Sequence, residues 1–327
     1  MRWRRTESRP PGPRAGSEQA GSERTGSLIP AEPDPAGQAD PDGQPDPPEG
    51  ARSLVVVVFD SLRYDAALAA GMANAGRLGP LERRWSYASW TAPSHYNLLM
   101  GLLPHSSPSR VYASEHYKAD YLRYRERLGV DGIEFKSLLP SIYLPTFLRN
   151  SLGYRTGALM SMPVLNRHTP INRDFDVYEL MPRHNDMAAM LNRLSFDAAR
   201  PSFWLLNHGE THYPYALPDD DPGEWPHISG VHGVVRRLDE QQSQPPTGDG
   251  DAFFDDEELE HLRGRQVRAA AYVDDLLSRL YDLVPAGTWI VVTSDHGELF
   301  GEGGYFGHGP IAHDKVFEVP FFEGRVR

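Results

Sequence analysis

The chain has 327 residues, of which 39% are hydrophobic, enough for one large α/β domain with a buried core or for two small domains. It contains no cysteine, which excludes disulfides, thiolate metal sites and cysteine nucleophiles. The formal net charge of −12 argues against a nucleic-acid partner, because a phosphate backbone is bound by clustered Lys and Arg.

Residues 1–50 differ in composition from the rest of the chain. They contain ten prolines and seven glycines and very few large apolar side chains. Such a segment cannot bury enough apolar surface to offset the entropy lost on ordering, so we predict a disordered tail. Its basic start is not followed by an apolar segment, and no run of about eighteen apolar residues occurs in the chain. We therefore expect no Sec signal peptide, no membrane span and a cytoplasmic protein.

Three short apolar segments, each followed by Asp or His, predict buried strands. They are residues 53–59 before Asp60, residues 201–207 before His208 and His212, and residues 288–293 before Asp295 and His296. Continuous runs of this kind are typical of parallel strands that are covered on both faces. Open α/β sheets bind ligands at the carboxyl ends of their strands, so the Asp and His residues indicate a site there.

Helices are predicted between these strands. Residues 262–284 carry apolar side chains at helical spacing, and residues 141–152 form a second predicted helix, followed by a strand over residues 156–160. Residues 218–260 are polar and predict a surface insertion, whereas residues 112–129 show no clear pattern. The fold class expected is α/β, with a central, largely parallel sheet that has helices on both faces.

Residues 90–95, Trp-Thr-Ala-Pro-Ser-His, precede an apolar stripe with helical spacing. Pro93 suits the first turn of a helix, which places Thr91 just before the helix N-terminus, where backbone N–H groups favour an anion. A hydroxyl still requires a metal or a base to become a nucleophile. The alternative is that Thr91 caps the helix. Ser94, the neighbouring hydroxyl, is expected to have a capping or packing role.

Asp60, Asp295 and His296 supply oxygen and nitrogen ligands that suit Ca²⁺, Mn²⁺, Mg²⁺ or Zn²⁺. Each also has an alternative interpretation, because an Asp at the end of a strand often caps the next helix.

The set of motifs resembles the sulfatase-like branch of the alkaline phosphatase superfamily. The motifs are residues 57–65 (VVFDSLRYD), 91–95 (TAPSH) with 99–105 (LMGLLPH), 293–298 (TSDHGE), 307–309 (GHG) and the Val-Pro pair at 319–320. Their order and spacing agree with that family over about residues 53–322. The resemblance implies an alkaline phosphatase/sulfatase-like catalytic domain over residues 51–327, with a C-terminal subdomain that is short or absent.

The resemblance also implies the roles of particular residues. One divalent metal ion is expected to be held by Asp60, Asp295 and His296, with the Thr91 oxygen as a further ligand. His212 and His308 are expected to contact the transferred group or the leaving oxygen.

One alternative and one departure from the family pattern concern the metal. His208, His212 and His308 could instead hold a second metal ion, as in two-metal phosphodiesterases of the superfamily. Many sulfatases carry a second carboxylate directly after the first, and Ser61 stands at that position here.

The activity implied is metal-dependent hydrolysis of phosphoric esters, mono- or diesters, with Thr91 as the nucleophile. Sulfatases of the family convert Cys or Ser to formylglycine, and oxidation of Thr gives a ketone instead of that aldehyde. Sulfuric ester hydrolysis and phospho-group transfer are the alternatives within the family. A degenerate member that binds an anion or a partner is the alternative outside catalysis. The expected substrate is a small-molecule, glycan-type or lipid-type phosphate or sulfate ester.

Overall fold

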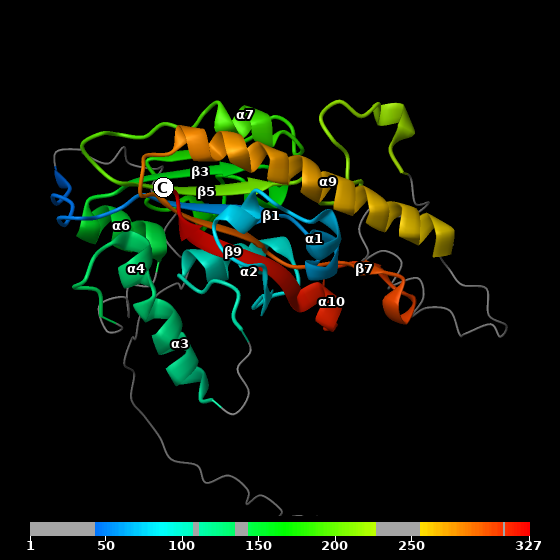
Figure 1. Cartoon of the computed structure of the whole chain (residues 1–327), viewed down its shortest axis with the longest axis horizontal. Helices are drawn as coiled ribbons and strands as arrows, with labels where there is room; N and C mark the ends of the chain where they lie inside the picture. Colours follow the sequence, from blue (N-terminus) through cyan, green and yellow to red (C-terminus); the bar gives the residue numbers. More distant parts are fainter. Residues whose placement is uncertain (1–42, 107–110, 135–142, 227–255, 310) are drawn as a thin grey trace, which may run out of the picture. The chain divides into compact units, whose positions relative to one another are not determined.

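The computed structural model describes residues 43–106, 111–134, 143–226, 256–309 and 311–327 (Figure 1). Residues 1–42 of the predicted tail and residues 227–255 of the predicted insertion lie outside this part of the chain. Residues 43–50 do lie within it, and there the Pro45 carbonyl accepts a hydrogen bond from Arg200 Nη1 at 2.8 Å.

A mixed sheet forms the centre of the domain. Its strands, in the described residues, are β1 Leu54–Phe59, β2 Glu82–Trp85, β3 Arg155–Met160, β4 Val177–Leu180, β5 Ser202–His208, β6 Trp289–Ser294 and β9 Glu318–Arg325, in the spatial order β2-β9-β6-β1-β5-β3-β4. β1 pairs in parallel with β5 and β6, and β3 pairs in parallel with β4 and β5. β9 runs antiparallel to β6 and β2. The largely parallel sheet is therefore confirmed, with antiparallel pairing at one edge.

Helices cover both faces of this sheet, as predicted. They are α1 Tyr64–Ala70, α2 Thr91–Leu99, α3 Ala113–Leu122, α4 Tyr124–Leu128, α6 Leu144–Leu152, α7 Met187–Leu191, α9 Asp256–Leu283 and α10 Asp314–Phe317. The sheet separates two large core clusters, one that includes α2, α4 and α6 and one that includes α1, α7 and α9, and a third, smaller cluster includes Tyr215 and Leu262. Figure 1 shows α9 lying across the sheet.

β1 explains why the core divides in this way. Leu54, Val56 and Val58 belong to one cluster, whereas Val55, Val57 and Phe59 belong to the other. All of these side chains are buried, because successive residues of a strand point to opposite faces and both faces carry helices.

Two helical segments differ from the sequence prediction. The helix predicted over residues 262–284 begins six residues earlier, at Asp256, and its first turn holds Asp256, Glu257 and Glu258. Acidic side chains at this end stabilise a helix through its dipole, which extends it into the polar segment. Residues 112–129, which show no clear pattern in the sequence, form α3 and α4. In the part of the chain that is described, the helices are too short or too polar to cross a bilayer.

Two glycines provide a matched test of the packing. Gly157 of β3 lies beside Trp204 of β5, and a Cβ atom at Gly157 would lie 2.3 Å from the indole ring. We expect Gly157→Ala to lower the free energy of unfolding by about 1–3 kcal/mol, because the ring must move within a packed core. A Cβ atom at Gly264 in α9 would meet no packed neighbour within 4 Å, so Gly264→Ala should instead raise stability by roughly 0.5–1 kcal/mol. Denaturant unfolding of both variants measures this, and shifts in the same direction would contradict the packing described.

Candidate active site

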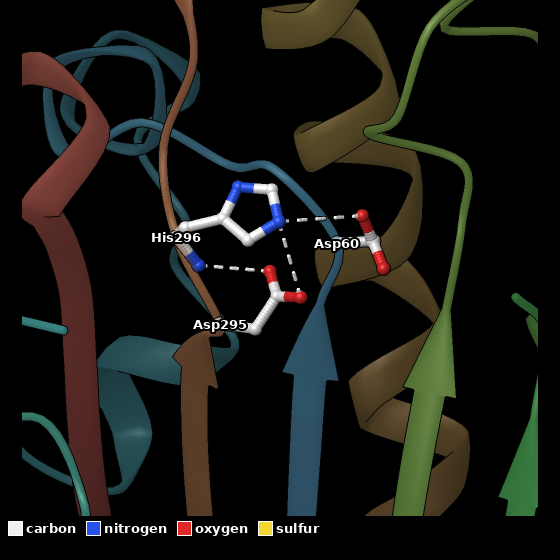
Figure 2. Close-up of side chains that lie close together, drawn as sticks. All are labelled: Asp60, Asp295 and His296. Atoms are coloured by element: carbon white, nitrogen blue, oxygen red, sulfur yellow. Dashed lines mark hydrogen bonds and ion pairs between the residues drawn. The ribbon is translucent and has the colours of Figure 1, made fainter. Parts of the chain in front are cut away.

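The carboxyl ends of β1 and β6 bring three predicted ligands together. Asp60 follows β1, and Asp295 and His296 follow β6, the neighbouring parallel strand. His296 Nε2 lies 3.4 Å from Asp295 Oδ2 and 4.0 Å from Asp60 Oδ1, and one ligand atom from each residue lies within 4.8 Å of the others (Figure 2). All three side chains are buried. The sequence prediction that these residues share one site is therefore matched by their placement.

The proton of His296 is held away from the two carboxylates. His296 Nδ1 lies 2.9 Å from the Gly297 carbonyl oxygen, which can only accept, so Nδ1 is the nitrogen that donates. Burial, followed by the charge of His308, lowers the pKa of His296 well below its usual value, which favours the neutral ring. The lone pair of Nε2 therefore faces the carboxylate oxygens.

One carboxylate oxygen of this group, on Asp295, has no hydrogen-bond donor. Asp295 Oδ1 accepts from the backbone N–H groups of Ser61 at 3.1 Å and His296 at 2.8 Å, but Asp295 Oδ2 is buried and has no hydrogen-bond partner. Burial and then the charge of Asp60 raise the pKa of Asp295 well above its usual value, the effect expected of two close carboxylates. An unpartnered Asp295 oxygen, an Asp60 oxygen and an imidazole lone pair that lie this close together fit a divalent cation.

Asp60 is oriented by polar neighbours that the sequence did not indicate. Its Oδ2 accepts from Asn207 Nδ2 at 3.2 Å, and its Oδ1 accepts from Ser61 Oγ at 3.2 Å. Burial opposes ionisation, but the charge of His212, the largest of the opposing effects, lowers the pKa of Asp60. Asp60 is thus the carboxylate of the pair that these neighbours keep ionised, and it can attract a cation.

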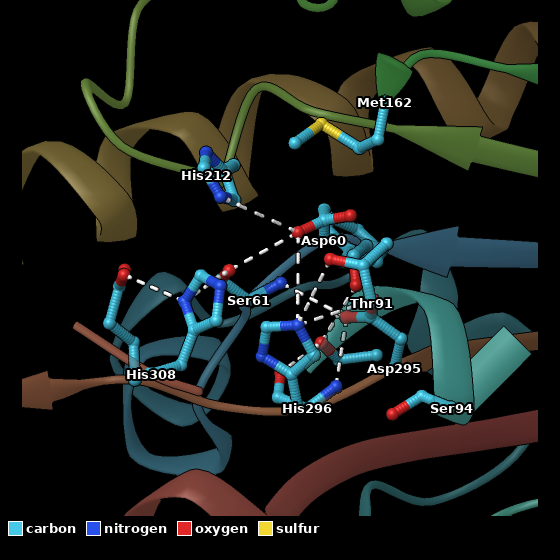
Figure 3. Close-up of polar contacts among 12 residues, drawn as sticks. Asp60, Ser61, Thr91, Ser94, Met162, His212, Asp295, His296 and His308 are labelled. Carbon is cyan, nitrogen blue, oxygen red and sulfur yellow. Dashed lines mark hydrogen bonds and ion pairs between the residues drawn. The ribbon is translucent and has the colours of Figure 1, made fainter. Parts of the chain in front are cut away.

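Thr91 lies at the first position of α2 and contacts this group. Its Oγ1 lies 3.4 Å from His296 Nε2, and the residue is 5% exposed (Figure 3). The residue before the helix is Trp90, whose side chain makes no capping hydrogen bond. The sequence predicts that Thr91 lies just before the helix, whereas in the structure it is the first helical residue. Its hydroxyl points to the predicted ligand His296.

Ser94, the competing hydroxyl, lies on the same helix but is turned away. Ser94 Oγ donates to the Ala88 carbonyl at 3.3 Å and lies 3.4 Å from Ser86 Oγ. Figure 3 shows Ser94 apart from Asp60 and Thr91. These contacts give Ser94 a packing role, in agreement with the prediction.

His212 and His308 lie next to the predicted ligands. Their rings are 5.3 Å apart, His212 Nε2 is 4.0 Å from Asp60 Oδ1, and the His308 ring is 4.3 Å from the His296 ring. Burial lowers the pKa of His308, but the hydrogen bond and charge of Glu298 outweigh it and the pKa is raised. The structure therefore brings both His residues to the place where a group bound at Asp60 would lie.

His208 is not part of this group. It is fully buried, its Nδ1 lies 3.0 Å from Glu210 Oε2, and its ring packs edge-on against Phe59 with centroids 4.3 Å apart. The cause is the alternation along β5, in which Asn207 faces Asp60 and the next residue points to the opposite face. The alternative cluster of His208, His212 and His308 is therefore not assembled. Within the described residues, the three side chains placed so that they could hold one metal ion are Asp60, Asp295 and His296.

Other residues at the site were missed by sequence reasoning. Glu298 stands in the Asp-His-Gly-Glu motif and could have been found there, whereas Tyr215 and Asn207 gave no signal. His95, one turn after Thr91, is fully buried, and its Nδ1 donates to the Thr91 carbonyl at 2.8 Å.

Arg63, which lies in the motif at residues 57–65, supports the loop after His296. Its Nη1 donates to Glu302 Oε1 at 2.6 Å and to the Glu298 carbonyl at 3.3 Å, and its Nη2 pairs with Asp65 at 2.6 Å. Arg63 therefore acts on the site through the backbone of this loop.

The fold and the site together define the class of the protein. A largely parallel α/β sheet with Asp, Asp-His and a helix-terminal Thr at its carboxyl ends agrees with the sulfatase-like branch of the alkaline phosphatase superfamily. Residues 54–323 match the Sulfatase family, so the chain belongs to that family. Curated proteins gave no significant match to the sequence.

Solved structures with the same fold are distant in sequence. The C-terminal periplasmic domain of EcEptC from Escherichia coli is 15% identical, with 87% of this chain and 77% of that chain covered and a TM-score of 0.52. The same domain in complex with Zn is 16% identical, with the same coverage and TM-score. A putative sulfatase from Bacteroides thetaiotaomicron VPI-5482 is 14% identical, with 85% and 65% covered and a TM-score of 0.50. At these identities the likeness shows the alkaline phosphatase-like fold.

Proposed function

We propose that the chain is a metal-dependent hydrolase of phosphoric esters that uses Thr91 as its nucleophile. The observation that carries this proposal is the position of the Thr91 hydroxyl. It lies at the N-terminus of α2 and 3.4 Å from His296 Nε2, beside two buried carboxylates, one of which has an oxygen, Asp295 Oδ2, without a hydrogen-bond donor. A nucleophile in that place can attack a phosphorus atom whose oxygens are held at the same site.

The residues of the chain have separate tasks in this reaction. Asp60, Asp295 and His296 would hold one divalent cation, and when bound it would polarise a phosphoryl oxygen and lower the pKa of the Thr91 hydroxyl. Backbone N–H groups at the start of α2 stabilise negative charge on the phosphoryl group. His212 and His308 contact the transferred group or the oxygen that leaves. Water then attacks phosphorus and releases Thr91.

Two alternatives within the family differ in the substrate or in the acceptor. Formylglycine chemistry requires Cys or Ser at the nucleophile position, and the chain has Thr91 there and no cysteine. Phospho-group transfer uses the same site, with an alcohol in place of water. The substrate class proposed is a small-molecule, glycan-type or lipid-type phosphate ester.

A panel of chromogenic esters tests this function. Wild-type protein should hydrolyse bis(4-nitrophenyl) phosphate or 4-nitrophenyl phosphate when Mn²⁺ or Zn²⁺ is added, and a chelator should abolish the activity. 4-Nitrophenyl sulfate should be a much poorer substrate, because sulfatases of the family use a different nucleophile. Preference for the sulfate ester would refute the phosphoric ester assignment. Tight binding of phosphate without turnover of any ester would favour a degenerate binding protein.

A further inference from the structure

A short hairpin places a carboxylate directly opposite His308. β7 Leu299–Phe300 and β8 Phe306–Gly307 are antiparallel, with Leu299 paired to Gly307. The same register sets Glu298 across from His308, and Glu298 Oε1 lies 3.1 Å from His308 Nδ1. Because Glu298 follows the predicted ligand His296 by two residues, this pair forms one wall of the candidate active site.

The second carboxylate oxygen of Glu298 accepts a hydrogen bond from a tyrosine side chain. Tyr215 is fully buried, and its hydroxyl donates to Glu298 Oε2. Glu298 is itself only 1% exposed, so few other donors can reach it. With Oε2 occupied, Oε1 is the oxygen left to accept from His308.

The other neighbour of His308 Nδ1 is also an acceptor. Ser61 Oγ lies 3.4 Å from Nδ1 and gives its own proton to Asp60 Oδ1 at 3.2 Å. A nitrogen that faces a carboxylate oxygen and a hydroxyl lone pair carries the hydrogen. His308 Nδ1 is therefore the N–H, and Nε2, on the other side of the ring, is the nitrogen that can exchange a proton with a substrate.

We propose that Glu298, anchored by Tyr215, is a positioning residue that holds the His308 proton on Nδ1 and so reserves Nε2 for the ester oxygen that leaves. This inference rests on the proposed phosphoric ester hydrolysis. Thr91 enters ionised, after its proton has passed to solvent, and the bond from Thr91 Oγ1 to phosphorus forms. The bond from phosphorus to the leaving oxygen breaks, and that oxygen takes the proton from Nε2. Water then bonds to phosphorus, Thr91 departs, and the proton of the water returns to Nε2.

The ring nitrogens of His308 give a test that requires no turnover. In ¹⁵N-labelled, Zn²⁺-loaded protein, at a pH where the ring is neutral, His308 should show the tautomer with hydrogen on Nδ1. Its signals are assigned by their loss in His308→Gln. Glu298→Ala should shift the ring toward a mixture of tautomers. Hydrogen on Nε2 in the wild-type protein, or no change in Glu298→Ala, would overturn the inference.

Leaving-group dependence tests the consequence for the reaction. Glu298→Gln should lower kcat for phenyl methyl phosphate at least about tenfold more than for 4-nitrophenyl methyl phosphate, because the more basic phenolate needs the proton more. The matched control is Glu302→Gln, in the same hairpin, which pairs with Arg63 at 2.6 Å and does not contact His308. It should affect both esters equally.

A double-mutant comparison separates positioning from a general structural role. Because Glu298 acts through His308, Glu298→Gln should cause no further loss in a His308→Gln background. Equal losses on both esters together with additive effects would refute the inference while leaving the proposed function intact. If the wild-type protein hydrolyses neither ester but His308 keeps its hydrogen on Nδ1, the proposed function fails and the orientation by Glu298 stands.

Discussion

Thr91→Ala is expected to lower kcat by roughly a thousandfold or more, since it removes the oxygen that forms the covalent bond to phosphorus. The loss should appear in kcat far more than in KM or in the binding of phosphate, because a nucleophile acts on the chemical step. The fold should survive, because within the described residues the hydroxyl makes a single hydrogen-bond contact, the long one of 3.4 Å to His296 Nε2. Thr91→Ser should keep measurable activity, since the hydroxyl remains.

Ser94→Ala is the matched control for this substitution. Ser94 lies one turn further along α2, is as buried as Thr91, and contacts Ala88 and Ser86 instead of the predicted ligands. Its loss should cost some stability and leave kcat within a few-fold of wild type. If Ser94→Ala were inactive and Thr91→Ala turned over ester at the wild-type rate, the nucleophile assignment would be wrong.

The site residues that the sequence predicted are mainly those that directly follow a strand. Apolar runs identify β1 and β6, and the residues that follow two neighbouring parallel strands must meet at one edge of the sheet. The apolar runs therefore place Asp60, Asp295 and His296 at strand ends, whereas the pairing of β1 with β6 is shown by the structure and the shared metal was implied by the family resemblance. Thr91 depends in the same way on a helix start signalled by Pro93. His212 was indicated by the apolar run over residues 201–207, but its role, and both the choice and the role of His308, came from the family resemblance.

The parts that the sequence did not predict depend on pairings between distant segments. β5 is buried on both faces, so no polar alternation reveals that Asn207 faces Asp60 while His208 points away. The contact of Glu298 with His308 depends on the register of a hairpin with only two residues in each strand. Tyr215 reaches Glu298 from more than eighty residues away in the sequence. Local patterns contain no information on such contacts.

Asp295→Ala is the substitution with the second large effect, and we expect it to change turnover, metal binding and the stability gained from metal. Removing this carboxylate should abolish turnover and most metal binding, as measured by elemental analysis. In metal-free protein it also removes a carboxylate whose pKa is raised by burial and then by the charge of Asp60, which favours folding. The same substitution leaves the backbone N–H groups of Ser61 and His296 without their acceptor, which opposes folding. Because these two effects offset each other, we expect only a small change in the metal-free Tm. The gain in stability on adding metal, about 2.7 kcal/mol at a hundred times Kd, should disappear.

Asp274→Ala is the control that separates loss of a ligand from loss of a buried carboxylate. Asp274 of α9 is 4% exposed and accepts from the backbone N–H groups of Ala75 at 2.8 Å and Asn74 at 2.9 Å, with no contact to the predicted ligands. Removing it leaves two buried donors unpaired and should cost about 1–3 kcal/mol with or without metal. The rise in Tm of the Asp274→Ala variant on adding metal should match that of the wild-type protein. Asp274→Ala should keep the stability gained on adding metal, whereas Asp295→Ala should lose it. A full metal complement and a normal increment in Asp295→Ala would therefore refute the metal site directly.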